Sequence, residues 1–266
     1  MSADLKRELE PLLCGRMGHP LRHLGSVGST NAEALAWAAT GAPEGAVVVA
    51  DEQSAGRGRW GRTWLSGRDA SLTFSLVLRP EAEAAGIGLL PLTLGVATAD
   101  AIEELTSLSA ALKWPNDVTY DGRKLAGILV ETRVEGGKVT AAIAGIGVNV
   151  GWGREEIPRD IAERATSLAV EMRGDPPSRA ALLAAILSWF EPLYDSLKAG
   201  SGADEIIRRA SLRSELLGED VLIRSPDGRE SRAKAVRLLP SGALEVAIEG
   251  RHEALDAGEI ERIRPA

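Results

Sequence analysis

The chain has 266 residues, of which 31 are lysine or arginine and 38 are aspartate or glutamate, so its formal net charge is −7. This balance disfavours binding to nucleic acid or to an anionic membrane over the whole surface, because both are favoured by a strong positive field, but a local basic site remains open. The single cysteine, Cys14, cannot form an internal disulfide, which fits a reducing compartment. Neither the apolar run of a signal peptide nor any 18-residue apolar stretch is present, so we expect a soluble, cytoplasmic protein without a membrane partner.

The first part of the chain predicts helices and strands around one unusual loop. The spacing of Thr30 and Glu33 fits a capping box, which predicts the start of a helix. Short apolar runs predict buried strands, and alanine-rich runs predict helices. In chain order we expect a helix over 32–40, a strand over 46–50, a loop of glycine and arginine over 54–68, a strand over 72–78 and a helix over 92–105.

From residue 111 onward the pattern predicts an antiparallel meander followed by helices. Asp121-Gly122 is a strong hairpin signal, and short turns between successive strands imply antiparallel pairing. Pro192 is expected to interrupt the first of the two helices that follow. The predicted strands are 111–114, 118–120, 124–132 and 138–146, and the predicted helices are 178–198 and 203–216.

The pattern of apolar and turn residues changes after Gly218. Evenly spaced short strands are predicted over 221–225, 232–238 and 244–248, separated by turns that contain glycine and proline. A stretch of roughly fifty residues of this kind suggests a small β-barrel. We therefore predict an α+β fold, with a mixed β-sheet catalytic domain flanked by helices over 1–216 and a small all-β domain over 217–266.

The loop over 54–68, SAGRGRWGRTWLSGR, contains four arginines, four glycines and no acidic residue. Guanidinium groups bind phosphate or carboxylate through forked donors, and glycines let backbone amides approach an anion closely. A solvated, flexible basic loop is the simpler interpretation. The density of arginine and the interleaved Trp60 and Trp64 favour instead a pocket for a small polyanionic ligand.

Gly56, Gly58 and Gly61 also match the dinucleotide fingerprint G-x-G-x-x-G. That fingerprint must open a helix whose N-terminus holds a pyrophosphate. Here a strand is predicted after the loop, so we reject a dinucleotide-binding fold.

Five segments, in their order and spacing, resemble the successive motifs of biotin protein ligases. They are GSTNAEA at 28–34, DEQSAGRGRWGRTW at 51–64, KWPNDV at 113–118, KLAGILVE at 124–131 and GIGVNV at 145–150. The resemblance covers residues 20–200, and the tail after Gly218 looks like the SH3-like C-terminal domain of that family. It implies a class II synthetase-like domain that uses ATP and Mg²⁺ to convert biotin to biotinyl-5′-adenylate. The biotin then passes to one lysine of the biotin carboxyl carrier protein of acetyl-CoA carboxylase or of a related carboxylase.

The resemblance implies which residues would bind biotin. Ser29, Thr30 and Asn31 would line the pocket for the ring system, whose polar urea needs fixed partners because an unpaired buried polar group costs about 1–3 kcal/mol. Helix capping by Ser29 and Thr30 is compatible with this role. The implied biotin site is Ser29, Thr30, Asn31, Gln53, Gly56, Arg57, Gly58, Arg59, Lys124 and Gly127.

The adenylate site implied by the resemblance overlaps with the biotin site. Arg57 and Arg59 would hold the carboxyl end of biotin and the adenylate phosphate, and Trp64 would pack near the adenine. Asp117 would assist the metal or the incoming lysine, or would only form a turn. The implied set is Arg57, Arg59, Arg62, Trp64, Lys113, Asn116, Asp117, Lys124 and Asn149, with Gly145 and Gly147 beside Asn149.

Lys124 and Arg59 are the expected catalytic residues. Lys124 begins a strand just after the Asp121-Gly122 turn, so a rigid element can aim its ammonium at the charge that develops on the α-phosphate. Ala126 and Gly127 are interpreted as small residues that let the ligand approach this strand. Two roles stay open for Trp60, namely covering the ligand or shielding the loop.

The sequence contains no C-x-x-C motif and no cluster of metal-ligating residues. His19, His23 and His252 are scattered along the chain. We therefore expect Mg²⁺ to be held mainly by the nucleotide phosphates, and the protein ligands of the metal stay open.

Three other functions are alternatives. A lipoate or octanoate ligase shares the fold and the adenylation chemistry, but such enzymes carry a different glycine-rich stretch with a histidine nearby. A biotin-sensing repressor needs roughly 60 residues for an N-terminal helix-turn-helix domain, which the 28 residues before Ser29 do not provide, so DNA is not an expected partner. A non-catalytic biotin-binding module would not need Lys124 and the arginine loop. The sequence leaves the choice between monomer and homodimer open.

Overall fold

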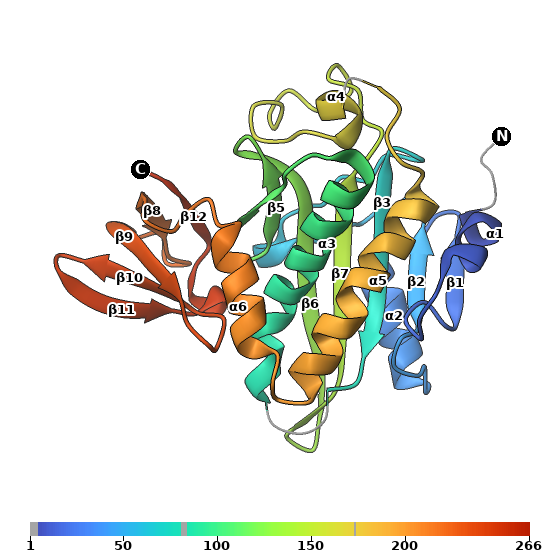
Figure 1. The fold of residues 1–266 in the computed structure, drawn as a ribbon, viewed down its shortest axis with the longest axis horizontal. Helices are drawn as coiled ribbons and strands as arrows, with labels where there is room; N and C mark the ends of the chain where they lie inside the picture. Colours follow the sequence, from blue (N-terminus) through green and yellow to red (C-terminus); the bar gives the residue numbers. More distant parts are fainter. Residues whose placement is uncertain (1–4, 81–83, 173) are drawn as a thin grey trace.

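The structure, a computed structural model, describes residues 5–80, 84–172 and 174–266. A seven-stranded mixed sheet carries helices on both faces, and a separate five-stranded antiparallel sheet lies at the C-terminal end of the chain (Figure 1). Together they confirm the predicted α+β class with a small all-β unit. The domain boundary at 216/217 stays a prediction.

The large sheet has the strand order β1-β2-β3-β7-β6-β5-β4. Strands β1 and β2 are parallel, and all other neighbours in this sheet are antiparallel, as predicted for the meander. The strands are β1 (Leu21–Leu24), β2 (Val47–Ala50), β3 (Ser71–Leu78), β4 (Ala111–Lys113), β5 (Asp117–Tyr120), β6 (Arg123–Glu135) and β7 (Lys138–Asn149).

The helices of the described chain are distributed over both faces of the large sheet. They are α1 (Leu5–Leu9), α2 (Thr30–Ala39), α3 (Leu90–Thr106), α4 (Leu168–Met172), α5 (Arg179–Lys198) and α6 (Ala203–Leu212), with short 3-10 turns at Glu10–Leu12, Arg59–Gly61, Ala84–Leu89 and Ala257–Glu259. The C-terminal sheet contains β8 (Asp220–Arg224), β9 (Glu230–Leu238), β10 (Leu244–Ile248), β11 (Arg251–Leu255) and β12 (Arg262–Pro265), in the order β11-β10-β9-β8-β12.

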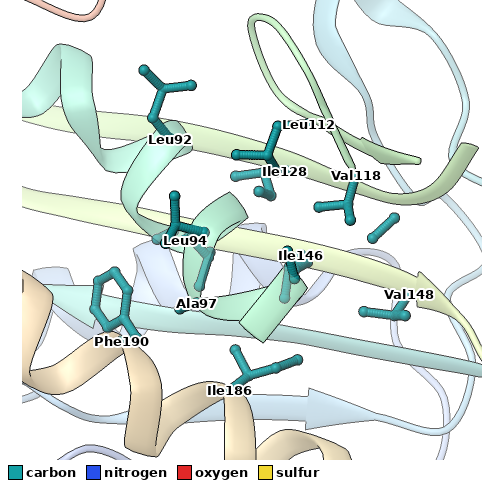
Figure 2. Packing of buried hydrophobic residues seen from close by; sticks show 14 of the residues in the cluster. Leu92, Leu94, Ala97, Leu112, Val118, Ile128, Ile146, Val148, Ile186 and Phe190 are labelled. Carbon is teal, nitrogen blue, oxygen red and sulfur yellow. The ribbon is translucent and has the colours of Figure 1, made fainter. Parts of the chain in front are cut away.

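One face of the large sheet forms the main apolar core with α3 and α5. Figure 2 shows Leu94 and Ala97 of α3 between Ile146 of β7 and Phe190 of α5, and all four side chains are buried. Removing a large apolar side chain of this kind from water stabilises the fold by about 1.5–3 kcal/mol. This core fixes the sheet on which the functional residues stand.

The opposite face of the sheet is covered in part by α2. Ala34 and Ala38 of this helix pack with Val48, Val77 and Ile143 in a second apolar cluster. Because side chains alternate along a strand, the residues of β3 on this face include the buried Ser71, Thr73 and Ser75. The polar part of this face lies beside the first turn of α2 and positions the site described below.

One helical stretch within the described residues, Gly86–Thr106, is long and apolar enough to cross a membrane by length and composition. Two thirds of it, 67%, is buried inside the fold. It contains α3, the central core helix, so its apolar character is explained by packing.

Several elements differ from the sequence prediction. Helix α5 runs through Pro192 without interruption, and the carbonyl that loses its helical donor belongs to Ser188, which is exposed to water. Ser29 is the N-cap residue of α2, it makes no side-chain capping bond, and Thr30 already lies inside the helix, so the predicted capping box is wrong. Helix α6 ends at Leu212 rather than at 216. Not predicted at all are α1, β1, α4, β11 and β12.

Candidate active site

One cavity of about 790 Å³ gathers the predicted site residues. This volume lies in the range of small-molecule sites. Its walls come from the start of α2, residues 53–65, strands β4 to β7, the segment 157–165 and the C-terminal residues 260–265. Of the predicted set, the lining contains Ser29, Thr30, Asn31, Gln53, Arg57, Gly58, Arg59, Arg62, Trp64, Lys113, Asn116, Asp117, Lys124, Gly127 and Asn149.

Gly56 and Ala126 do not line the cavity. A Cβ on Gly56 would lie 2.5 Å from the backbone oxygen of Trp64, so this glycine lets the two ends of the loop pack together. Ala126 is fully buried in the main core, because it falls on the other face of β6 from Gly127. The expected role of Ala126 in ligand approach is therefore wrong.

Glycines on β6 and β7 make a flat floor in this cavity. Gly127 and Gly147 are paired in register, and the indole of Trp64 lies against both, since a Cβ on Gly147 would overlap with its ring. A Cβ on Gly145 would overlap in the same way with the amide of Asn31. The indole Nε1 of Trp64 is buried and has no hydrogen-bond partner within the described chain.

A buried hydroxyl organises the polar wall of the cavity. Ser75 Oγ lies 2.6 Å from Asn31 Oδ1 and 2.8 Å from Thr30 Oγ1, and Ser75 is fully buried. The backbone amide of Thr30 donates to Gln53 Oε1 at 2.7 Å, which turns Gln53 Nε2 away from Thr30. Sequence reasoning missed Ser75. The alternation of small polar and large apolar residues in SLTFSLVL is the signal that marks a polar face there.

Glu131 continues this wall toward the arginine loop. Its Oε2 accepts a hydrogen bond from Asn31 Nδ2 at 2.7 Å and another from Arg57 Nη2 at 3.0 Å. Asn31 Nδ2 also donates to the Leu129 carbonyl at 3.2 Å, so the amide of Asn31 is occupied by protein groups. Glu131 belongs to the KLAGILVE motif, but no role was expected for it.

Lys124 is held rigidly at the edge of the cavity. Its Nζ lies 2.6 Å from Asp117 Oδ1 and 5.5 Å from the centre of the Trp64 ring. Its backbone amide donates to the carbonyl of Arg164 at 2.8 Å, and its carbonyl accepts from the amide of Thr166 at 2.9 Å. The ammonium is thus aimed into the cavity, where it can stabilise a developing negative charge.

The arginine loop is attached to the C-terminal residues 257–261. Arg59 donates to the carbonyl of Ala257 and, at 3.0 Å, to that of Ile260, while Arg62 Nη2 donates to the carbonyl of Glu261 at 2.9 Å. Trp60 Nε1 donates to the same Ile260 carbonyl at 2.9 Å. Trp60 does not line the cavity, so in this structure it joins the loop to the C-terminal residues rather than covering the site.

The surroundings of Arg59 disfavour its positive charge. Burial is the largest influence and lowers the pKa of Arg59, the charge of Arg62 lowers it further, and the carboxylate of Asp117 opposes both. Arg59 also reaches Asn116, whose Oδ1 lies 3.4 Å from Nη1. The guanidinium therefore lies between the KWPND segment and the C-terminal residues.

The two predicted asparagines fix the backbone around the cavity. Asn116 Nδ2 donates to the carbonyl of Ile128 at 2.7 Å, and Asn149 Nδ2 donates to that of Thr166 at 2.9 Å. Lys113 lines the cavity, and no carboxylate of the described chain forms an ion pair with it. Lys113 can therefore meet an anionic ligand directly.

Within residues 5–80, 84–172 and 174–266, no group of three or more His, Cys, Asp or Glu side chains could hold a metal ion. The carboxylates of the cavity lining are Asp117, Asp160 and Glu261. This donor set suits a metal such as Mg²⁺ that takes one or two carboxylates and completes its shell with phosphate oxygens and water.

Known proteins share this fold and these motifs. The model of the biotin/lipoate A/B protein ligase family matches residues 25–149. The biotin--[acetyl-CoA-carboxylase] ligase of Mycobacterium tuberculosis is 32% identical over 242 residues, which are 89% of this chain and 86% of that protein. The bifunctional ligase/repressor BirA of Bacillus subtilis is 38% identical over 178 residues, 67% of this chain, and the match spans only 54% of that relative.

A solved structure is similar over nearly the whole chain. The biotin protein ligase from Aquifex aeolicus in complex with biotin and ATP has a TM-score of 0.80 and 32% sequence identity, and covers 93% of this chain and 100% of its own. The likeness in sequence and in structure thus extends over both sheets. This chain belongs to the biotin/lipoate A/B protein ligase family, among its biotin protein ligases.

Proposed function

We propose that this chain activates biotin with ATP to biotinyl-5′-adenylate and transfers biotin to a lysine of a carrier protein, such as the biotin carboxyl carrier protein of acetyl-CoA carboxylase or of a related carboxylase. The observation that carries the proposal is the meeting of Lys124, the arginine loop and the polar wall of Thr30 and Gln53 in one cavity. The similar structure from Aquifex aeolicus is a complex with biotin and ATP, and the Mycobacterium tuberculosis relative is a biotin--[acetyl-CoA-carboxylase] ligase.

In the first step, a carboxylate oxygen of biotin attacks the α-phosphorus of ATP. The new P–O bond forms as the bond to the bridging oxygen breaks, and pyrophosphate leaves with the electron pair. Lys124 Nζ, held 2.6 Å from Asp117, stabilises the charge that builds up on the phosphate oxygens. Arg57 can exchange Glu131 for the anionic end of the ligand, since that ion pair is partly exposed.

In the second step, the neutral amine of the acceptor lysine attacks the biotinyl carbonyl. An amide bond forms, the anhydride C–O bond breaks, and AMP leaves with the electron pair. The amine loses one proton, and Asp117 is the carboxylate beside Lys124 that can accept it once pyrophosphate has left.

Mg²⁺ would be held by the nucleotide phosphates and by Asp117, the cavity carboxylate that contacts Lys124. The ion would partly neutralise the triphosphate and make pyrophosphate a better leaving group.

The test is release of pyrophosphate from ATP by purified protein with Mg²⁺, with biotin or lipoate added. We expect release with biotin and little with lipoate, whose dithiolane ring offers no urea to the polar wall. The proposal fails if biotin causes no release, and release with lipoate alone would assign the chain to the other branch of its family. A larger shift in Tm with biotin and ATP than with lipoate and ATP checks the same preference without turnover.

We further infer a cytoplasmic location, biotin and ATP as small-molecule ligands, and no DNA partner. The net charge of −7 and the single exposed cysteine, Cys14, support these statements. Light scattering on the purified protein distinguishes a monomer from a homodimer.

A further inference from the structure

The backbone of Lys124 lies where the regular ladder of the large sheet is interrupted. On one side, the register of β6 with β5 shifts by a bulge between Lys124 and Ala126. On the other side, the pairing of β6 with β7 begins only at Ala126. A bulge disrupts the ladder locally, and bulges are over-represented beside active sites. The two neighbouring strands therefore leave the backbone at Lys124 less constrained than the rest of β6.

Residues 164–166 give the backbone of Lys124 its additional support. The bond from its amide to the Arg164 carbonyl and the bond from the Thr166 amide to its carbonyl form a parallel bridge between Lys124 and Ala165. Arg164 and Ala165 also line the cavity. A displacement of residues 164–166 would therefore shift Lys124 and one wall of the cavity together.

Glu171 of α4 joins this segment back to β6. Its Oε1 accepts a hydrogen bond from the hydroxyl of Thr166 and lies 3.0 Å from Arg123 Nη2, and its Oε2 accepts from the same Nη2 at 3.3 Å. The side chain of Glu171 is only 9% exposed, and Thr166 is fully buried. Arg123 directly precedes Lys124 in the chain. One carboxylate thus holds the backbone just before Lys124 and the residue that is bonded to the Lys124 carbonyl.

The short helix α4 gives Glu171 a fixed base. Ser167 Oγ donates to the carbonyl of Trp152 at 2.5 Å, and the amide of Ala169 donates to the carbonyl of Val150 at 2.9 Å. These bonds attach α4 to the segment that follows β7. Glu171 itself does not line the cavity. Its carboxylate can therefore act on the reaction only through the residues that it contacts.

We propose that Glu171 is a positioning residue for Lys124, because its bonds to Arg123 and Thr166 hold the Lys124 backbone where Nζ meets the α-phosphate. The proposal rests on the proposed function, in which Lys124 stabilises the charge of the transition state. The ion pair with Asp117 fixes the far end of the Lys124 side chain, and Glu171 fixes its near end. Such precision matters, because a misplacement of about 1 Å can lower a rate about 10²-fold.

The test compares Glu171→Gln with Asp100→Asn. A glutamine at 171 can still accept a bond from the Thr166 hydroxyl, but it lacks the charge that attracts Arg123. Asp100 is the matched control, since its side chain is 12% exposed and its carboxylate lies 3.0 and 2.6 Å from two guanidinium groups. It stands on α3 and does not line the cavity. Both substitutions thus remove the charge from a carboxylate that is largely buried and paired.

For Glu171→Gln we expect kcat for biotin-dependent pyrophosphate release to fall about tenfold to a hundredfold, with little change in KM for biotin. Asp100→Asn should lower Tm by a similar amount and keep kcat near that of the wild type. Both substitutions are also made in Lys124→Ala protein and measured with enzyme in excess. There Glu171→Gln should still lower Tm but add little to the loss of rate, because the residue through which it acts is absent.

Hydrogen exchange of the protein without ligand follows the backbone directly and needs no turnover. In Glu171→Gln, exchange should become faster at the amides of Lys124 and Thr166, which donate within the bridge, and should not change along the β6–β7 ladder. Thr166→Val breaks the same link at its other end and should have the same local effect. Asp100→Asn should leave exchange at the bridge unchanged.

Three results would overturn the positioning role. They are an equal loss of kcat in Glu171→Gln and Asp100→Asn, a loss from Glu171→Gln that is as large in Lys124→Ala protein as in the wild type, and exchange at Lys124 and Thr166 no faster than in the control. A wild type that releases no pyrophosphate would refute the proposed function instead. The exchange measurement would still decide whether Glu171 holds the backbone of Lys124.

Discussion

At the scale of single residues, Ser75 connects two side chains of the polar cavity wall to the sheet. Thr30 and Asn31 stand in the first turn of α2, and both contact the Ser75 hydroxyl. Its position opposite Gly145 in the β3–β7 register leaves space for the amide of Asn31. Without this hydroxyl, the Oδ1 atom of Asn31 would lack its donor, and the orientation of the pocket wall would be lost.

Changing Ser75→Ala should therefore raise KM for biotin about tenfold, the equivalent of one ordinary hydrogen bond, with a much smaller effect on kcat. The matched control is Thr73→Val on the same strand. Thr73 is equally buried, but its hydroxyl donates to the Ala50 carbonyl at 3.2 Å, outside the pocket wall. Steady-state kinetics and thermal unfolding of both variants separate the two cases. An equal rise in KM for the control would show that Ser75 acts only through stability.

Changing Lys124→Ala should lower the rate of biotin-dependent pyrophosphate release by about 10²–10³-fold, the usual effect of removing one group that stabilises transition-state charge. Biotin binding, measured by titration without ATP, should change only a few-fold. Lys138→Ala, at the exposed start of β7, is the control. Parallel losses in rate and in biotin affinity would instead indicate a binding role for Lys124.

The sequence predicted the residues of the cavity better than their connections. The motif residues Lys124 and Asp117 are recognisable in the chain, and so are Ser29 and Thr30. By contrast, the role of Ser75 depends on its register with β7 and on a helix that is distant in sequence. Glu131 likewise stands in a recognised motif, but its bonds to two other motifs exist only in the folded sheet.

At the scale of elements, a cluster of ion pairs joins the edge of the large sheet to helix α5. Asp51, which follows β2, lies 3.0 Å from His23 of β1 and 3.0 Å from Arg179 of α5. Arg179 also contacts Asp69, just before β3, at 2.6 Å. Burial is the largest single influence on Asp51 and would raise its pKa, but the bonds from His23 and Arg179 outweigh it, so the pKa of Asp51 is lowered.

Changing Asp51→Asn should destabilise the protein by about 2 kcal/mol at pH 7, since it leaves the nearly buried Arg179 with one carboxylate fewer. A lowered pKa means that the carboxylate contributes stability above its ordinary value of 3.8 and loses it as the pH falls below that value. The difference between Asp51→Asn and the wild type should thus shrink below about pH 3.8. Urea unfolding at pH 7 and at pH 3 measures it, with exposed Asp175→Asn as control. A difference that is independent of pH would contradict this account.

Elements with a clear period or turn were predictable, and elements that depend on distant partners were not. The meander follows from its hairpin turns, and α3 from its apolar run. Strand β1 is only four residues long and has no alternation of polar and apolar residues, so its parallel pairing with β2 leaves no trace in its sequence. Helix α5 continues at Pro192, and Ser188, whose carbonyl loses its helical donor, is an exposed residue, which the sequence does not reveal.

At the scale of the whole molecule, the arginine loop connects the large sheet to the C-terminal sheet. It lies between β2 and β3 in the chain, but its anchors are the carbonyls of residues 257–261. The resemblance to biotin protein ligases implied the second sheet, but not this attachment, because it consists of bonds to backbone atoms that any residue can supply. Those bonds place Arg59 and Arg62 at the cavity.

Changing Trp60→Phe should remove one bond of this attachment and speed tryptic cleavage after Arg59 and Arg62 by about threefold to tenfold, as expected for a hydrogen bond that resists local opening. Trp189→Phe is the matched control, because its Nε1 donates to Glu104 at 2.7 Å between two helices. Mass spectrometry of the fragments locates the cuts. If both variants are cut in the loop at the same rate, the attachment through Trp60 contributes nothing to loop order.

The attachment of the loop also has a consequence for protein synthesis. Arg59 and its acceptors on Ala257 and Ile260 are separated by 198 and 201 positions along the chain. Almost all of the chain, up to residue 261, must therefore leave the ribosome before these bonds can form. Lys124 and the glycines of β6 and β7 emerge far earlier. Because residues 260–265 line the cavity, a nascent chain lacks that wall of the cavity throughout this time.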